Sequence, residues 1–271
     1  MTGTTLLLTQ PDSRWVADVR PSPNIGPRNN GLRPTLLIMH YTGMVSATRA
    51  IDWLARPESH VSCHYVIDED GRITQMVAEV TRAWHAGRSY WQGETDINSA
   101  SIGIEIQNPG HEDGYHPFPR AQMRGVRDLA RDIIVRHRIA PHCVLAHSDV
   151  APARKIDPGE KFDWPWLAKA GIGHWVAPIP SDVGDPGFNL GPHCPETRLM
   201  QTMLTQYGYD TASSAAFDLA LQTNVTAFQR HFRPERVDGR IDQSTLQTLA
   251  ALIAALPTGA ADPTRSGVSS R

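Results

Sequence analysis

A histidine and a carboxylate lie close together in the sequence and could share one metal ion. His147 follows the apolar run 143–145, which has the pattern of a short strand, and the loop after it carries Lys155 and Asp157. Neutral imidazole and carboxylate are both good zinc ligands, and an ammonium group beside them could face whatever the metal binds. The loop could therefore supply two ligands and a catalytic cation, although an ordinary charged surface loop would have a similar composition.

His40 is the candidate for a third ligand. It ends the continuous apolar run 35–39, which is typical of a strand buried on both faces. Functional groups gather at strand ends in α/β sheets, so His40 and His147 would converge if their strands are neighbours. Two histidines and a carboxylate would leave a tetrahedral zinc ion with one open position for water. On its own, His40 fits a core histidine equally well.

A predicted strand over residues 101–107 carries a carboxylate in its middle. Its alternation would place Glu105 on one face with Ser101, Gly103 and Gln107, and three isoleucines on the other. Apolar periodicity and an Asp-Gly turn indicate further elements: strands at 63–67 and 73–77 and helices at 46–54 and 120–138. Intermixed strands and helices predict an α/β domain with a mixed central β-sheet flanked by helices.

The C-terminal third differs in character from the rest of the chain. Proline and glycine are frequent up to residue 192, as in a linker, and only helical patterns follow, at 197–207, 215–232 and 243–256. A three-helix module of this size is small but can fold alone. The predicted organisation is an irregular lead-in at 1–32, the α/β domain at 33–175, a linker at 176–192, a three-helix domain at 193–257 and a disordered tail at 258–271.

Composition excludes several classes of function. The formal net charge of the 271 residues is −2, so no global basic field exists to hold nucleic acid. No apolar run is long enough to cross a bilayer. The odd number of cysteines, which lie far apart, cannot form a closed disulfide framework and suits a reducing compartment: Cys63, Cys143 and Cys194.

The ordered motifs resemble the zinc-dependent N-acetylmuramoyl-L-alanine amidases related to phage T7 lysozyme and the peptidoglycan recognition proteins. They are IMHYT at 38–42, SCHY at 62–65, AWHAG at 83–87, NSASIGIE at 98–105, and AH followed by KIDPG within 146–159. They come in the family's order and span roughly residues 33–175. The most similar groups are the bacterial amidases called AmiD, which carry a C-terminal peptidoglycan-binding domain, and their relatives called AmpD.

This resemblance implies roles for the candidate residues. It implies that His40, His147 and Asp157 hold one Zn²⁺ ion. It also implies that Glu105 is the catalytic glutamate, which passes a proton from water to the leaving amine, and that Lys155 stabilises the oxyanion. Four further positions match residues that line the sugar–peptide cleft: His64, Trp84, His85 and Asn98.

The expected reaction is zinc-dependent hydrolysis of the amide between N-acetylmuramic acid, or its 1,6-anhydro form, and L-alanine. Peptidoglycan fragments or cell wall are the expected partners, and no organic cofactor is needed. One alternative is a non-catalytic muropeptide recognition protein, although such members of the family typically lack a zinc ligand and all three are present here. The other alternative is a zinc hydrolase of a different amide.

The three C-terminal helices resemble the peptidoglycan-binding type 1 domain. The matching residues are 228–229, 237–239 and 244–245, although Gln243 or Ser244 stands where a glycine is common. A bundle that only packs on the catalytic domain is the alternative.

The N-terminal residues decide the expected location. Three leucines follow no basic residue and precede no cleavage pattern, so a cytoplasmic protein is expected if the chain is complete. AmiD-like proteins are exported, which makes a periplasmic or outer-membrane-associated protein the alternative.

Overall fold

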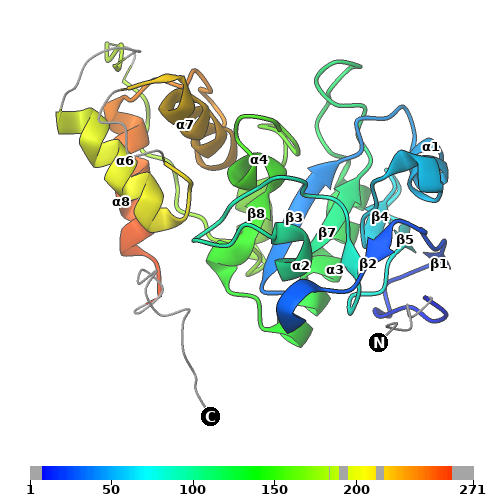
Figure 1. The fold of residues 1–271 in the computed structure, drawn as a ribbon. Coiled ribbons are helices and arrows are strands. Elements are labelled where there is room, and N and C mark those ends of the chain that lie inside the picture. Colours follow the sequence, from blue (N-terminus) through cyan, green and yellow to red (C-terminus); the bar gives the residue numbers. More distant parts are fainter. Residues whose placement is uncertain (1–7, 183, 189–194, 212–216, 258–271) are drawn as a thin grey trace.

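A mixed six-stranded sheet lies at the centre of the computed structural model (Figure 1). The structure describes residues 8–182, 184–188, 195–211 and 217–257. The sheet order is β1-β5-β4-β7-β3-β8. The bounds are β1 (Asp18–Val19), β3 (Leu36–Tyr41), β4 (Tyr65–Ile67), β5 (Ile73–Gln75), β7 (Ser101–Ile106) and β8 (Val144–Ala146). A separate antiparallel pair is formed by β2 (Ile25–Gly26) and β6 (Arg82–Ala83).

The central strands β3, β7 and β8 are parallel, and their register brings the candidate residues together. His40 of β3 is paired with Glu105 of β7, and Met39 is paired with Ala146 at the end of β8. His147 follows Ala146 directly, so it lies beside the end of β3. Because parallel strands have their carboxyl ends at the same edge, three functional groups meet there.

The two faces of β7 differ as its alternation predicts. Ile102, Ile104 and Ile106 are fully buried and belong to the core that packs under α3 (Arg120–His137). The opposite face carries Ser101, Gly103 and Glu105 and borders the cleft described below.

Short helices connect the strands. Ser46 caps α1 (Ala47–Leu54) through its hydroxyl, and Asp96 caps α2 (Ile97–Ala100) through its carboxylate. The remaining short elements are α4 (His147–Val150), α5 (Trp164–Lys169) and the 3₁₀ turns η1 (Asn29–Gly31), η2 (Pro57–Ser59) and η3 (Pro141–Cys143). His147 therefore begins a helical turn, whereas the sequence indicated the start of a loop.

The N-terminal lead-in is more regular than expected. β1 extends the sheet by pairing with β5, and the Arg28 side chain lies across the connection to β7. Its guanidinium donates hydrogen bonds to the carbonyl oxygens of Glu79, Ser99 and Ser101. Strands of two residues are too short to have a readable period, so the sequence did not indicate them.

Three helices make up the C-terminal module, as the periodicity predicts: α6 (Pro195–Tyr207), α7 (Leu219–Phe232) and α8 (Gln243–Ala254). Figure 1 shows them grouped at one end of the sheet, with α7 beside α4. Predicted parts at 189–194, at 215–216 and in the tail at 258–271 lie outside the described residues.

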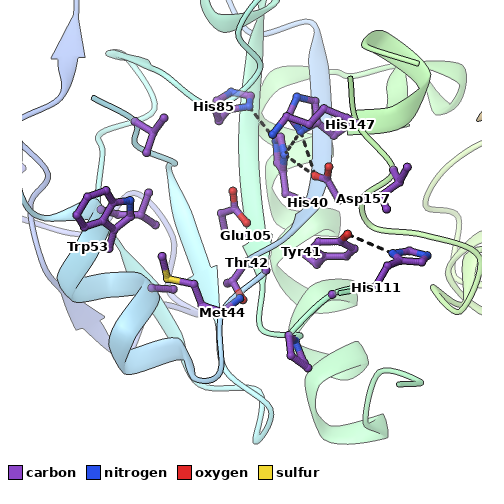
Figure 2. Close-up of a pocket in the computed structure, with 18 of the residues that line it drawn as sticks. His40, Tyr41, Thr42, Met44, Trp53, His85, Glu105, His111, His147 and Asp157 are labelled. Atoms are coloured by element: carbon purple, nitrogen blue, oxygen red, sulfur yellow. Dashed lines mark hydrogen bonds and ion pairs between the residues drawn. The ribbon is translucent and has the colours of Figure 1, made fainter. Parts of the chain in front are cut away.

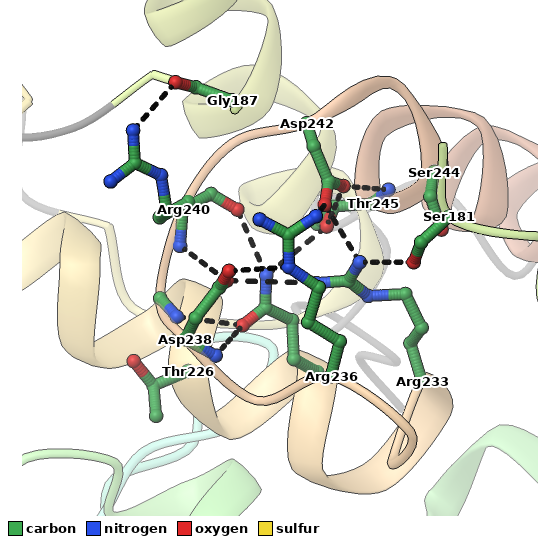
Figure 3. A network of polar contacts seen from close by, with 12 residues as sticks. Ser181, Gly187, Thr226, Arg233, Arg236, Asp238, Arg240, Asp242, Ser244 and Thr245 are labelled. Atoms are coloured by element: carbon green, nitrogen blue, oxygen red, sulfur yellow. Dashed lines mark hydrogen bonds and ion pairs between the residues drawn. The ribbon is translucent and has the colours of Figure 1, made fainter. Parts of the chain in front are cut away.

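A buried polar network fixes the turn between α7 and α8 (Figure 3). Arg233 donates to Asp242 across 2.7 Å, and both side chains are almost completely buried. Asp242 also caps α8 by accepting from the Thr245 amide. Gln229 donates to the Arg240 carbonyl and accepts from the Gly239 amide. All of these partners belong to the C-terminal module.

The module and the sheet share one hydrophobic core. Leu36, Ile38 and Leu145 on the sheet belong to the same buried cluster as Tyr207 and Phe228 of the module. None of the helices in the described ranges combines the length and apolar character that crossing a membrane requires.

Candidate active site

A cleft opens at the carboxyl ends of β3 and β7, where the candidate residues lie (Figure 2). Five of its lining residues were predicted to carry the chemistry: His40, Glu105, His147, Lys155 and Asp157. Its outer wall includes Trp53 and Met44, from α1 and the loop before it.

Three ligand atoms converge on one point of this cleft. The Nδ1 atoms of His40 and His147 are 2.8 Å apart, and Asp157 Oδ2 lies 3.1 and 3.0 Å from them. All three side chains are buried, and they form a group that could hold a metal ion. Ligand atoms on a tetrahedral zinc ion are about 3.3 Å apart, so this triangle is close to the size that zinc requires.

The tautomer of His147 is set by a backbone carbonyl. His147 Nε2 lies 3.2 Å from the Ala86 carbonyl oxygen. A carbonyl oxygen can only accept, so Nε2 carries the proton and Nδ1 presents a lone pair toward His40 and Asp157.

The tautomer of His40 is set by a longer chain of hydrogen bonds. The Ser101 hydroxyl donates to the Ile97 carbonyl at 2.5 Å, so its oxygen must accept from His85 Nε2 at 3.1 Å. His85 Nδ1 is then an acceptor, and it lies 3.0 Å from His40 Nε2. His40 therefore donates through Nε2, and its Nδ1 also presents a lone pair.

Two lone pairs and a carboxylate facing one another require a cation between them. Burial lowers the pKa of His40 to about 4, with a further contribution from His147, so this imidazole is neutral at pH 7. Asp157 brings a carboxylate oxygen to the same point, 3.1 and 3.0 Å from the two Nδ1 atoms. A divalent metal fits this donor set, because it would replace repulsion among three electron-rich atoms with coordination.

The segment 84–87 is held in place by Asn98 and by a glycine. Asn98 Oδ1 accepts hydrogen bonds from the amides of His85 and Ala86. The His85 ring lies over Gly103, where a Cβ atom would be 2.5 Å from it. These contacts position both of the groups that orient His40 and His147.

Glu105 lies beside the three ligand atoms without a hydrogen-bond partner for Oε2 among the described residues. Burial, reinforced by the charge of Asp157, raises the pKa of Glu105 well above its ordinary value. Lys155 also lines the cleft. A carboxylate with raised pKa and a cation on the walls of one cleft can act on a proton and on a developing negative charge.

The four residues predicted to line the substrate cleft lie in different places. Trp84 and His85 line the cleft, whereas His64 and Asn98 are not among the described residues that line it. His64 is fully buried, with Nδ1 accepting from the Gly103 amide and Nε2 facing the Thr81 carbonyl. Ser101 was not singled out as a site residue. Its position on the Glu105 face of β7 was the available signal.

Substitution of Ser101 tests the hydrogen-bond chain to His40. Ser101→Ala is expected to weaken zinc affinity about 10-fold, because His85 loses the acceptor that fixes its tautomer. Groups that are hydrogen-bonded to a metal-ligating histidine, as His85 is to His40, typically contribute 10- to 100-fold to metal affinity. Zinc dissociation constants from chelator competition measure this effect. Ser99→Ala is the matched control, because Ser99 is also buried and its hydroxyl oxygen accepts a hydrogen bond from the Asn29 amide. Equal zinc affinities for the two variants would contradict a role for the hydrogen bonds that connect Ser101 to His40.

Buried neutral histidines make the metal-free protein sensitive to acid. Burial lowers the pKa of His40 to about 4 and, together with Arg28, that of His64 to about 3. The unfolded chain binds protons near pH 6.5 and the native protein only at lower pH, so stability falls as the pH drops through this interval. Urea unfolding after chelation should give a free energy several kcal/mol lower at pH 4.5 than at pH 7.5.

Glu79 contributes little to this loss, because its stabilisation is lost between the ordinary glutamate pKa of 4.5 and its lowered native pKa of about 2, which lies below the interval. His64→Gln is expected to lose less stability between the two pH values, since one buried imidazole is removed. Equal stability of the parent protein at both pH values would refute the assignment.

The chain matches known families in both of its parts. Residues 30–160 match the family model described as N-acetylmuramoyl-L-alanine amidase, and residues 195–249 match one described as "Putative peptidoglycan binding domain". AmiD of Escherichia coli is 36% identical over 239 residues, which cover 82% of this chain and 83% of that protein. AmpD of Salmonella typhimurium is 32% identical over 174 residues, which cover 57% of this chain and 91% of that protein.

Solved structures show the same architecture. AmiD from E. coli, in complex with the substrate anhydro-N-acetylmuramic acid-L-Ala-D-gamma-Glu-L-Lys, superposes with a TM-score of 0.72 at 33% identity, covering 88% of this chain and 94% of that one. AmpDH3 from Pseudomonas aeruginosa superposes with a TM-score of 0.69 at 31% identity, covering 84% and 94%. These matches confirm the predicted fold class and the resemblance carried by the motifs. The chain therefore belongs to the N-acetylmuramoyl-L-alanine amidase family.

Proposed function

We propose that this protein hydrolyses the amide between the lactyl group of N-acetylmuramic acid, or its 1,6-anhydro form, and L-alanine. The observation that carries the proposal is the convergence of His40, His147 and Asp157 beside Glu105, which has an unpartnered carboxylate oxygen among the described residues. The three proposed metal ligands and the proposed proton-transfer group lie in one cleft, which supports an enzyme over a non-catalytic recognition protein.

Zinc is the metal that we propose for the site. Two imidazole nitrogens and one carboxylate oxygen are a typical ligand set for catalytic zinc, which keeps a fourth position open. When bound, zinc would act as a Lewis acid toward the scissile carbonyl and lower the pKa of water. His40, His147 and Asp157 would hold it, and the Ala86 carbonyl and His85 would orient the two imidazoles.

Glu105 is proposed to move the proton during hydrolysis. Its raised pKa makes it a stronger base than an exposed glutamate, so it can take a proton from the attacking water. The water oxygen bonds to the carbonyl carbon, the C–N bond breaks, and Glu105 gives the proton to the leaving amine nitrogen. Lys155 faces the same cleft and is proposed to stabilise the negative charge on the carbonyl oxygen during this step.

The substrate class is proposed by analogy with relatives. AmiD from E. coli has been solved with an anhydromuropeptide substrate, and AmpDH3 has been solved with an anhydromuramic pentapeptide. The outer wall of the cleft, with Trp53, Met44 and Trp84, offers apolar surface for a sugar ring or peptide. We propose peptidoglycan or its muropeptides as partners, and a catalytic domain at 33–175 followed by a linker and a peptidoglycan-binding-like domain at 193–257.

Product analysis by mass spectrometry tests this function. Incubation with anhydro-muropeptide should release a free peptide that begins with L-alanine, and chelation should stop the release until zinc is returned. An unrelated acyl-peptide, expected to stay intact, separates this amidase from a zinc hydrolase of another amide. Muropeptide that binds but is never cut by the zinc-loaded protein would favour the recognition protein instead.

The location of the protein also stays a prediction. We propose the cytoplasm, with the periplasm or outer membrane as the alternative. Fractionation of cells that express the protein from its natural gene distinguishes the two locations. A cytoplasmic protein would have access to soluble anhydro-muropeptides, and an exported one would have access to intact wall.

A further inference from the structure

A carboxylate two residues after a metal ligand is held by the C-terminal helical module. Asp149 lies in α4, whose first residue is His147, and its side chain is completely shielded from solvent. Its Oδ2 accepts a hydrogen bond from the Ala146 amide at 2.8 Å. This bond closes the first turn of α4 and fixes the backbone at the point where His147 leaves β8.

Two residues of the module form further hydrogen bonds with this carboxylate. His231 of α7 places Nδ1 2.6 Å from Asp149 Oδ2, and the Tyr209 hydroxyl donates to Oδ1 at 2.6 Å. The His231 ring is itself wedged between Trp164 and Phe232, stacked at centroid distances of 3.9 and 3.8 Å. The hydrogen bond therefore connects α4, which begins with His147, to α7 of the module.

The neighbouring residue of α7 reaches the segment of the other loop ligand. Arg230 lies 3.6 Å from the Glu160 carboxylate, three residues after Asp157. The same carboxylate contacts His111 at 3.1 Å. The two segments are joined directly by the Ser148 amide, which donates to the Asp157 carbonyl at 3.0 Å. Adjacent residues of α7 thus contact the chain beside both His147 and Asp157.

From this arrangement we infer that the C-terminal module is a positioning element of the metal centre, with His231 and Tyr209 acting on His147 through Asp149. The inference rests on the proposed metal site. It adds a second role to the C-terminal module, which matches a family described as a putative peptidoglycan binding domain. A carboxylate buried this deeply needs all of its donors, because a missing partner leaves a desolvated charge that would drive α4 to rearrange. A shift of α4 moves His147 Nδ1 away from the other two ligand atoms.

His231→Phe tests the inference in the full-length protein. Phenylalanine keeps an aromatic ring between Trp164 and Phe232 and removes the donor to Asp149. The expected result is a zinc affinity about 10-fold weaker in chelator competition, which is the size of effect that outer partners of metal ligands have. Tyr209→Phe, a milder change that deletes the other donor, should weaken zinc affinity in the same direction and serves if His231→Phe does not fold.

Gln229→Met is the matched control. Gln229 lies two residues from His231 on α7, and its hydrogen bonds are formed with other residues of the module (Figure 3). It should lower the free energy of unfolding, measured in urea, while leaving zinc affinity as in the parent protein. A purely structural role of His231 predicts that the two variants behave alike.

The outcomes separate the two claims. Parent-like zinc affinity in both His231→Phe and Tyr209→Phe, or an equal loss in Gln229→Met, would overturn the positioning role and leave the metal site intact. Absence of zinc binding by the parent protein would overturn the proposed function itself, and the inference with it.

Discussion

Glu105→Gln is expected to lower kcat on a muropeptide by about 10²- to 10⁴-fold, the contribution typical of a positioned general acid–base group. Glutamine has nearly the same shape but cannot take a proton from water at neutral pH. Zinc affinity should stay close to that of the parent protein, because Glu105 is not one of the three converging ligands. Steady-state release of free peptide, with zinc content measured in the same samples, gives both quantities.

Glu112→Gln provides the matched control for this change. Glu112 also lines the cleft, but it has no place among the groups around the ligand atoms, so most of the activity should remain. A Glu105→Gln variant that retains zinc and cuts at a similar rate to Glu112→Gln would show that another group moves the proton.

Asp157→Asn should weaken zinc affinity by more than about 100-fold, since it alters a ligand directly and even outer partners contribute 10- to 100-fold. Asparagine keeps the size of the side chain but removes the negative charge from the three-ligand group. Chelator competition measures the affinity, and peptide release at limiting zinc should fall in parallel.

A second aspartate separates this effect from a general one. Asp163→Asn keeps a side-chain oxygen to cap α5 and should bind zinc as the parent protein does. Excess zinc should restore part of the activity of Asp157→Asn. Tight zinc binding by that variant, in the parent range, would mean that the metal is held elsewhere.

The sequence predicted the convergence of His40 and His147 because each residue lies at the end of an apolar run. The apolar run before His40 and the one before His147 indicated two buried strands, and parallel pairing of β3 and β8 brings their ends together. The alternation around Glu105 also predicted its direction, since three buried isoleucines occupy the opposite face. Alternation is a strong signal where one face of a strand is apolar and the other carries polar or small residues.

The orientation of the ligands could not be predicted in the same way. His85 was placed on the cleft wall by its motif, but its bond to His40 depends on a ring packed over Gly103 and on Ser101. Such contacts join segments that are separate in the sequence and have no common period. The docking of α7 on α4 is a further example, because His231 and Asp149 meet only through the tertiary fold.

The helices of the module lie where their periodicity predicts them, whereas the domain boundaries stay a prediction. What composition could not indicate is the shared core, in which Ile38 of the central sheet and Phe228 of α7 belong to one cluster. The apolar face of a helix predicts that this face is buried, but it does not identify the element that packs against it.

Anomalous diffraction at the zinc absorption edge, from crystals of the zinc-loaded protein, tests most directly whether three distant side chains share one ion. We expect one peak at about 2.0–2.2 Å from His40 Nδ1, His147 Nδ1 and Asp157 Oδ2. A peak bound by other residues, or none at this point in protein that releases peptide, would contradict the shared site.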